Sequence, residues 1–486
     1  MSISPNIIIL ITSILLFVSV LSSKTANRTG LPMLTFFLLI GMLAGSDGIG
    51  KISFDHPEAA QFLGIIALCF ILFSGGLDTK FEQVKPIVWR GITLSTLGVL
   101  VTAILVGVFV YWLTNFTWVE SLLLGSIVSS TDAATVFSIF RSKKTRLKRN
   151  LQETLEFESG SNDPMAYFLT LMFIALIKQP EISIWSMLPM FLKGMFLGGL
   201  MGFLIGKLTV RIINRVSLYV EGLYPVLTIA MMFFSYSLTE FIDGNGFLAI
   251  YISGLILGNS NFIHKRSLLK FYDGFAWLMQ ILMFLTLGLL VFPSKMTPII
   301  GIGLLISVFL MLVARPLAML LCFLPFKIYY KDLMFVSWGG LKGAVPIIFA
   351  TYPMVEKVPN AEMIFHIVFF ITLTSLLLQG TTLINVAKWL KLIIPEGKSK
   401  KPVLEFESHH IKSVLEEIMV EPDFRCVNQT IVDLELPKTA LIVMIERDNK
   451  YFTPNGSTVI EAGDHLTVLA DTKKNLDMTF NALKEN

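Results

Sequence analysis

The segment Glu158-Ser-Gly-Ser-Asn-Asp-Pro164 lies inside an apolar stretch, residues 151–176, that is long enough to cross a membrane. It places the carboxylate of Asp163 near the middle of the bilayer. A charge at that depth costs roughly 2.5–3.5 kcal/mol on insertion scales. Charged residues kept there usually serve ion pathways, proton relays or counter-ions. The segment therefore predicts a membrane protein with a transport site.

The composition is typical of a polytopic membrane protein. Of the 486 residues, 54% are hydrophobic and 15% are charged, whereas soluble domains have about 25% charged residues. The net charge of +4 is modest and the basic residues lie in loops, so we expect no nucleic-acid partner. The first apolar stretch, Ile7–Val20, lacks a basic segment before it and a cleavage site after it, which predicts a retained span.

Hydropathy predicts an all-α fold with about 13 membrane spans. The second and the ninth are short. The spans are expected near residues 5–22, 32–46, 60–77, 91–112, 118–140, 151–176, 184–209, 221–242, 246–258, 270–292, 297–323, 332–354 and 361–388.

Basic residues in the loops predict the orientation of the chain. The segment Arg141–Arg149 is the densest basic loop, and counting outward places six further basic loops on the same side. Cytoplasmic loops carry an excess of Lys and Arg. We therefore expect an external N-terminus and a cytoplasmic tail. The alternate loops carry only Lys51, Lys178, Lys295 and Lys357.

Five ionisable residues belong to spans rather than loops: Asp132, Glu158, Asp163, Arg315 and Lys342. Glu158 and Arg315 fall at a similar depth, about 10–14 Å, and are predicted to pair. Such a pair can be structural, because a matched pair binds nothing. The three acids and two bases sum to −1, which suits a site for one monovalent cation. A proton and an alkali cation are expected to compete for Asp163.

Two spans are interrupted. The fifth reads Ser129-Ser-Thr-Asp132, and the twelfth reads Trp338-Gly-Gly-Leu-Lys-Gly-Ala-Val-Pro346. Interrupted helices at matching positions of two halves indicate a transporter site. With the seventh span as a linker, spans one to six and eight to thirteen form two inverted six-helix halves. Lys342 is expected to compensate charge at the broken helix.

Oxygen atoms suited to a hard cation gather in this part of the sequence. Pro164 lacks an N–H, so the carbonyl of Gly160 loses its helical partner. Asn162 and Asp132 add side-chain oxygens. Thr131 either joins them or only caps a half-helix.

Two glycine patterns have structural interpretations. Gly194, Gly198, Gly202 and Gly206 recur every four residues, which predicts close helix packing. Gly244-Asn-Gly-Phe-Leu-Ala249 matches a loose dinucleotide fingerprint, but it joins two spans and lacks a βαβ context. No metal-ligand spacing or nucleophile–base arrangement stands out, so neither an enzyme nor a cofactor is expected.

The chain changes character after Pro402. We expect a transmembrane domain at 1–392, a linker at 393–402 and a small α+β domain at 403–486. Strands are predicted at Ile431–Leu436, Leu441–Glu446 and His465–Leu469, followed by a helix at Lys473–Leu483.

In its membrane-spanning part the chain resembles the monovalent cation:proton antiporters, in the branch with Asn-Asp rather than Asp-Asp. The resemblance covers about residues 5–390 and rests on Thr131-Asp132, Asn162-Asp163 and the Gly-Gly-Leu-Lys-Gly-Ala run. It implies inverted repeats, a mobile core, a homodimer interface and elevator-like alternating access. It also implies electroneutral exchange of one cation for one proton. Many relatives have Arg where this chain has Lys342.

Carried over by residue, the resemblance makes Asp163 the cation- and proton-binding carboxylate and Asn162 its neighbour. Thr131 and Asp132 would lie at the broken helix, and Glu158 would pair with Arg315.

The tail resembles a TrkA-C (RCK C-terminal) regulatory domain, which implies a small effector such as a nucleotide or cyclic dinucleotide. The tail and the Glu158–Pro164 segment together resemble potassium/proton antiporters of cell-volume regulation. We therefore expect a bacterial inner-membrane K⁺/H⁺ antiporter regulated by its tail. The alternatives are Na⁺/H⁺ exchange and a tail-gated cation channel, although a Thr-Val-Gly-Tyr-Gly filter is absent from the sequence.

Overall fold

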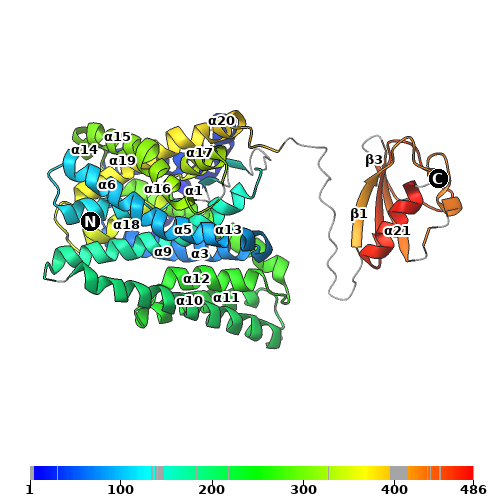
Figure 1. Ribbon diagram of the computed structural model, residues 1–486, viewed down its shortest axis with the longest axis horizontal. Coiled ribbons are helices and arrows are strands. Elements are labelled where there is room, and N and C mark those ends of the chain that lie inside the picture. Colours follow the sequence, from blue (N-terminus) through cyan, green and yellow to red (C-terminus); the bar gives the residue numbers. More distant parts are fainter. Residues whose placement is uncertain are drawn as a thin grey trace. The chain divides into compact units, whose positions relative to one another are not determined.

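The computed structural model describes residues 5–29, 31–132, 135–136, 139–140, 147–181, 183–216, 218–326, 328–394, 414–434, 436–437, 439–447 and 450–484. The chain separates into two compact units, Met1–Ile394 and Pro395–Asn486. The first is built of helices and the second carries a sheet (Figure 1). Residues 141–146 of the predicted basic loop and 395–402 of the predicted linker lie outside the described residues.

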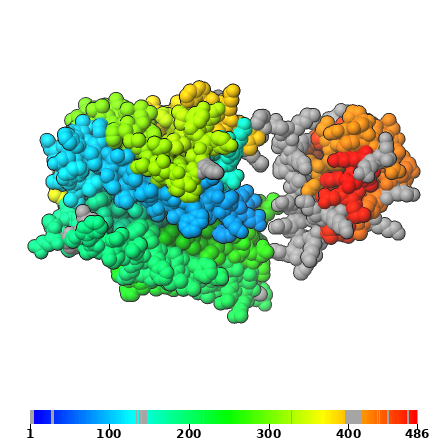
Figure 2. Space-filling view, in the orientation of Figure 1, coloured from blue at the N-terminus to red at the C-terminus, as the bar shows by residue number. Residues whose placement is uncertain are grey.

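Seven helices of the described chain pack mainly with one another and form what we call the first bundle. Helices α10 and α11, green in Figure 2, form one side of the helical unit Met1–Ile394. The first bundle comprises α1 (Pro5–Thr29), α2 (Met33–Ala44), α3 (Pro57–Asp78), α10 (Ile184–Arg215), α11 (Leu223–Phe241), α12 (Gly246–Gly258) and α13 (Lys265–Leu289).

The other helices of this unit form the second bundle, which meets the first through α9 and α18. Its helices are α4 (Phe81–Val84), α5 (Val88–Thr93), α6 (Val99–Leu113), α7 (Trp118–Ile127), α9 (Leu151–Lys178), α14 (Pro293–Met296), α15 (Ile300–Phe309), α16 (Arg315–Phe323), α17 (Tyr330–Gly339), α18 (Ala344–Val355), α19 (Ala361–Ser375) and α20 (Thr381–Trp389).

The helical stretches that cover the fourth and eleventh predicted spans, Phe81–Leu113 and Pro293–Phe323, share a local pattern. Each begins with a four-residue helix, continues through a 3₁₀ turn that contains Pro (Lys85–Ile87 and Thr297–Ile299), and later contains a π-helical turn (Leu94–Gly98 and Leu310–Ala314). A third π-helical turn, Leu376–Gly380, joins α19 to α20. The likeness of these two spans agrees with the predicted pairing of the halves.

A helix or a broken helix occupies each predicted span. Among the described residues, eight helices are long and apolar enough to cross a membrane, and the bent pair α17–α18 makes a ninth candidate. The apolar helices α2, α7 and α12 are shorter. The all-α polytopic fold is therefore confirmed, while about 13 crossings stay a prediction.

The glycine stripe of α10 packs against α12, as its spacing predicts. A Cβ atom on Gly202 would lie 2.6 Å from the carbonyl oxygen of Ala249, so only glycine allows this approach.

The second unit contains a four-stranded antiparallel sheet of order β1-β4-β2-β3. Helix α21 packs against it over an apolar core that includes Ile445, Leu466 and Leu476. This agrees with the predicted α+β domain. Its elements are β1 (Val414–Met419), β2 (Ala440–Arg447), β3 (Lys450–Phe452), β4 (His465–Ala470) and α21 (Lys473–Lys484).

The strand predicted at Ile431–Leu436 is wrong, because Ile431–Leu434 is a 3₁₀ helix. The Thr430 hydroxyl donates to the Asp433 carboxylate, and the Asp433 N–H donates to the Thr430 carbonyl at 3.1 Å. Such local hydrogen bonds compete with strand pairing.

Candidate functional site

Helix α9 carries four polar side chains on neighbouring turns of its buried surface: Glu158, Ser159, Asn162 and Asp163. Residues four apart lie one above the other on a helix, so Ser159 stands beneath Asp163 and Glu158 beneath Asn162. Asn162 is fully buried and Asp163 is 4% exposed. The helix continues through Pro164 without a break.

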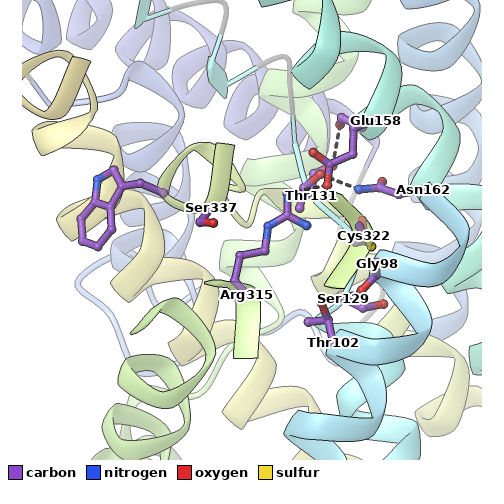
Figure 3. A network of polar contacts seen from close by, with 12 residues as sticks. Gly98, Thr102, Ser129, Thr131, Glu158, Asn162, Arg315, Cys322 and Ser337 are labelled. Carbon is purple, nitrogen blue, oxygen red and sulfur yellow. Dashed lines mark hydrogen bonds and ion pairs between the residues drawn. The ribbon is translucent and has the colours of Figure 1, made fainter. Parts of the chain in front are cut away.

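The break in the fifth span lies against this face of α9. The Ser130 hydroxyl donates to Asp163 Oδ1 at 2.5 Å. The Asn162 amide donates to Thr131 Oγ1 at 2.5 Å (Figure 3). The Ser159 hydroxyl donates to the Thr131 carbonyl at 2.6 Å. The predicted neighbours Thr131, Asn162 and Asp163 are thus brought together.

The break in the twelfth span meets the first break. Helices α17 and α18 are bent by 50° across residues 340–343. The Asp132 N–H donates to the Leu341 carbonyl at 2.8 Å. A Cβ atom on Gly343 would lie 1.8 Å from Asp132 Oδ2, so the approach of the two segments requires glycine.

Opposite charges lie at the broken helix ends. Lys342 Nζ donates to the Ser130 carbonyl at 2.9 Å and to the Ser129 carbonyl at 3.2 Å, just beyond the C-terminus of α7. A cation is favourable there, because a helix C-terminus carries partial negative charge. The Asp132 carboxylate accepts the Thr135 N–H at 3.2 Å and its hydroxyl at 2.8 Å.

Arg315 and Glu158, predicted to pair, are in contact. Arg315 Nη2 donates to Glu158 Oε1, and the side chains are 2% and 1% exposed (Figure 3). Glu158 Oε2 and Arg315 Nε have no hydrogen-bond partner among the described residues. The guanidinium packs on the backbone of Gly340 in the second break. The pair therefore ties α9 to α16 and to that break.

One buried oxygen of the residue before Asp163 lacks a hydrogen-bond partner among the described residues. Asn162 Oδ1 is buried and accepts no hydrogen bond from the described part of the chain. Amide and carboxylate oxygens are the kind of ligand that a hard cation prefers. The donor set around Asp163 therefore fits an alkali cation as a transported substrate.

The sequence interpretation missed the side chains that support this arrangement. Ser130 and Ser159 hold the first break to α9. The Ser375 hydroxyl accepts the Lys342 N–H at 3.0 Å, and Gln379 donates to the Trp338 carbonyl at 3.0 Å. A polar pair four residues apart within the apolar span 361–388 was the available signal for Ser375 and Gln379.

The chain matches two family models and several known proteins. Residues 12–389 match the family model described as sodium/hydrogen exchanger, transmembrane, and residues 415–484 match the TrkA-C domain. The chain is 38% identical to the K(+)/H(+) antiporter NhaP of Alkalimonas amylolytica, over 96% of this chain and 81% of that protein. It is 39% identical to the K(+)/H(+) antiporter NhaP2 of Shewanella sp. (strain ANA-3), over 97% of this chain and 82% of that protein.

Among solved structures, the sodium proton antiporter MjNhaP1 from Methanocaldococcus jannaschii superposes with a TM-score of 0.67 at 24% identity. The match covers 78% of this chain and 100% of that chain, and it shows a shared fold. A family match over most of the membrane unit, close relatives along nearly the whole chain and a shared fold lead to one conclusion. The chain belongs to the sodium/hydrogen exchanger family and carries a C-terminal TrkA-C domain.

Proposed function

We propose that this protein is a secondary antiporter that exchanges K⁺ for H⁺ across a bacterial inner membrane. The observation that carries the proposal is the position of Asp163, a buried carboxylate that accepts a hydrogen bond from the first of two crossed helix breaks. The names of relatives at 38% and 39% identity favour K⁺ as the cation. Na⁺ is the alternative substrate.

In this mechanism Asp163 holds either a cation or a proton. The Ser130 hydroxyl can donate to the carboxylate, and after rotation it can accept from the carboxylic acid. Asn162 Oδ1 and Thr131 Oγ1 are the neighbouring oxygens for the cation. One positive charge replaces the other, so exchange at one cation per proton is electroneutral.

The charged residues around Asp163 keep the rest of the site balanced. Lys342 and Asp132 offset the broken helix ends, while Glu158 and Arg315 neutralise each other. With all five ionised, the formal sum is −1, and one bound monovalent cation brings it to zero.

The packing of the helices supports elevator-type alternating access. All the proposed site residues belong to the second bundle, and α9 and α18 face the first bundle through α12 and α3. A movement of the second bundle along this face would carry Asp163 and its counter-charges together. We extend the proposal to a homodimer with an external N-terminus and a cytoplasmic tail.

The proposed regulation by the tail has a physical route to the site. The Lys148 N–H donates to the Leu392 carbonyl at 2.9 Å, and Leu147 forms an antiparallel bridge with Ile393. Residues 147–148 lie two residues before the start of α9, and residues 392–393 lie shortly before the segment that leads to the tail. Through these hydrogen bonds, a displacement of that segment would move the start of α9, the helix that carries Asp163. A nucleotide or cyclic dinucleotide is the proposed effector.

The test is exchange in proteoliposomes that contain a pH dye, given pulses of K⁺ or Na⁺. We expect K⁺ to change the internal pH in the wild type and not in Asp163→Asn. A response to Na⁺ alone would keep the mechanism and replace the substrate. Equal responses of the mutant and the wild type would reject the proposal.

A further inference from the structure

The turn between α11 and α12 brings a polar side chain of the first bundle to the helix that carries Asp163. The side-chain amide of Asn245 donates to the carbonyl oxygen of Pro164 at 2.9 Å. Asn245 is 6% exposed. Since Pro164 directly follows Asp163, the first bundle reaches within one residue of the proposed cation ligand.

Two hydrogen bonds fix Asn245 within the first bundle. Its Oδ1 accepts the Leu248 N–H at 3.0 Å and caps α12, and its backbone N–H donates to the Gly194 carbonyl of α10 at 2.9 Å. Because Oδ1 accepts an N–H, the NH₂ group must be the one that faces Pro164. Asn245 is therefore a donor of fixed position and orientation.

The glycines beside Asn245 allow this turn to pack tightly. A Cβ atom on Gly244 would lie 2.6 Å from Thr239 Cγ2, and one on Gly246 would lie 2.7 Å from Tyr236 Cδ2. The Gly-Asn-Gly sequence that resembles a dinucleotide fingerprint thus has a different use. It places the side-chain amide of Asn245 against the Pro164 carbonyl of α9.

Two other hydrogen bonds between the bundles lie next to chain connections. The Phe81 N–H donates to Asn259 Oδ1 at 2.7 Å beside the α3–α4 connection, and the Ser294 N–H donates to Asp47 at 3.0 Å beside the α13–α14 connection. Those contacts can persist as hinges when the bundles move. The Asn245–Pro164 contact joins residues 81 apart and lies away from these connections.

We propose that Asn245 is a positioning residue that stabilises one of the two alternating-access states by holding α9 at a fixed height against the first bundle. This inference rests on the proposed antiport mechanism. When α9 slides, the hydrogen bond to Pro164 must break, so only one state contains it. Asn245 acts on transport through α9, without touching the cation.

Loss of one neutral hydrogen bond from a single state should change the ratio of the two states about fivefold. The state that becomes more populated binds K⁺ with a lower apparent KM at the face to which it opens. The apparent KM at the opposite face must rise. A defect in the site itself would raise the apparent KM at both faces or lower the maximal rate alone.

The test uses two variants and one control in proteoliposomes, with K⁺ varied on either side. Asn245→Ser keeps an oxygen for the Leu248 N–H but is too short to reach Pro164, and Asn245→Asp keeps the cap without the donor. The control is Tyr272→Phe, which removes a buried hydrogen bond of 3.1 Å to Thr228 within the first bundle.

We expect both Asn245 variants to shift the apparent KM for K⁺ in opposite directions at the two faces. In Asn245→Ser the two fold-changes should multiply to about five. Tyr272→Phe should leave both values unchanged. If the Asn245 variants have the wild-type apparent KM for K⁺ at both faces, this inference is overturned and the proposed function is not affected. Absence of exchange in the wild type would instead reject the proposed function, and the inference with it.

Discussion

The backbone N–H of Asp132 donates to the carbonyl oxygen of Leu341 at 2.8 Å, so two interrupted helices are joined at their breaks. A second contact runs in the opposite direction, because the Lys342 ammonium group donates to the carbonyl oxygens of Ser129 and Ser130. Backbone groups left open by one break are thus satisfied by the other. The crossing holds Thr131 and Ser130 against α9.

Removal of the Lys342 charge should destabilise this crossing. Lys342→Met leaves two buried carbonyls without their donor, at a cost of roughly 3 kcal/mol. We expect a lower melting temperature in detergent and little exchange. Lys342→Arg keeps the charge and should melt close to the wild type, although its planar group hydrogen-bonds differently. Equal melting temperatures for the Met variant and the wild type would contradict this role.

Gly343 should tolerate no side chain. In Gly343→Ala the new Cβ would lie 1.8 Å from Asp132 Oδ2, which forces the two breaks apart. We expect exchange to fall at least about tenfold, since a misplacement near 1 Å can cost far more. Gly274→Ala is the control, because a Cβ there meets no atom within 4 Å. Similar exchange rates in the two variants would refute the prediction.

The ion pair of Glu158 and Arg315 is expected to be structural. Arg315→Met alone leaves a buried carboxylate unpaired, which costs about 3–5 kcal/mol. Glu158→Gln in the same chain should restore most of the stability and the exchange. A double-mutant cycle on melting temperature and transport rate measures both. A double variant that folds but does not exchange would show that the pair takes part in transport.

The contact between Lys148 and Leu392 should transmit the state of the tail. Lys148→Pro removes the N–H that donates to Leu392. Lys148→Ala keeps that N–H and removes only the exposed hydrogen bond from Lys148 Nζ to the Lys391 carbonyl. Deletion of residues 403–486 should change how pH or effector activates exchange, without abolishing flux. We expect Lys148→Pro to reproduce that altered profile and Lys148→Ala to keep the wild-type one. Complete loss of flux in a well-expressed truncation would make the tail structural.

Much of the fold was predictable because its signals are local. Apolar length marks the spans, and the polar runs at residues 129–132 and 338–346 mark the breaks. Asp163 and Asn162 stand out because charged and amide groups are costly in an apolar span. In the tail, alternation of side chains predicted β2 and β4 but was misleading at Ile431–Leu434, where Thr430 and Asp433 bond locally.

The partners of the site residues depend on contacts between distant segments. Ser130 is one of many hydroxyls in the chain, and its role appears only when the first break packs on α9. Asn245 is 81 residues from Pro164, and no spacing rule links them. The sequence could therefore predict which residues are unusual, but not which neighbours hold them in place.

Proton release on cation binding tests the central claim most directly. Purified protein in weakly buffered detergent solution is titrated with K⁺ while a pH indicator counts the protons released. If one carboxylate holds either ion, the wild type should release up to one proton per chain, and Asp163→Asn should release none. Release by Asp163→Asn equal to the wild type, or K⁺ binding without proton release at any pH, would contradict the account.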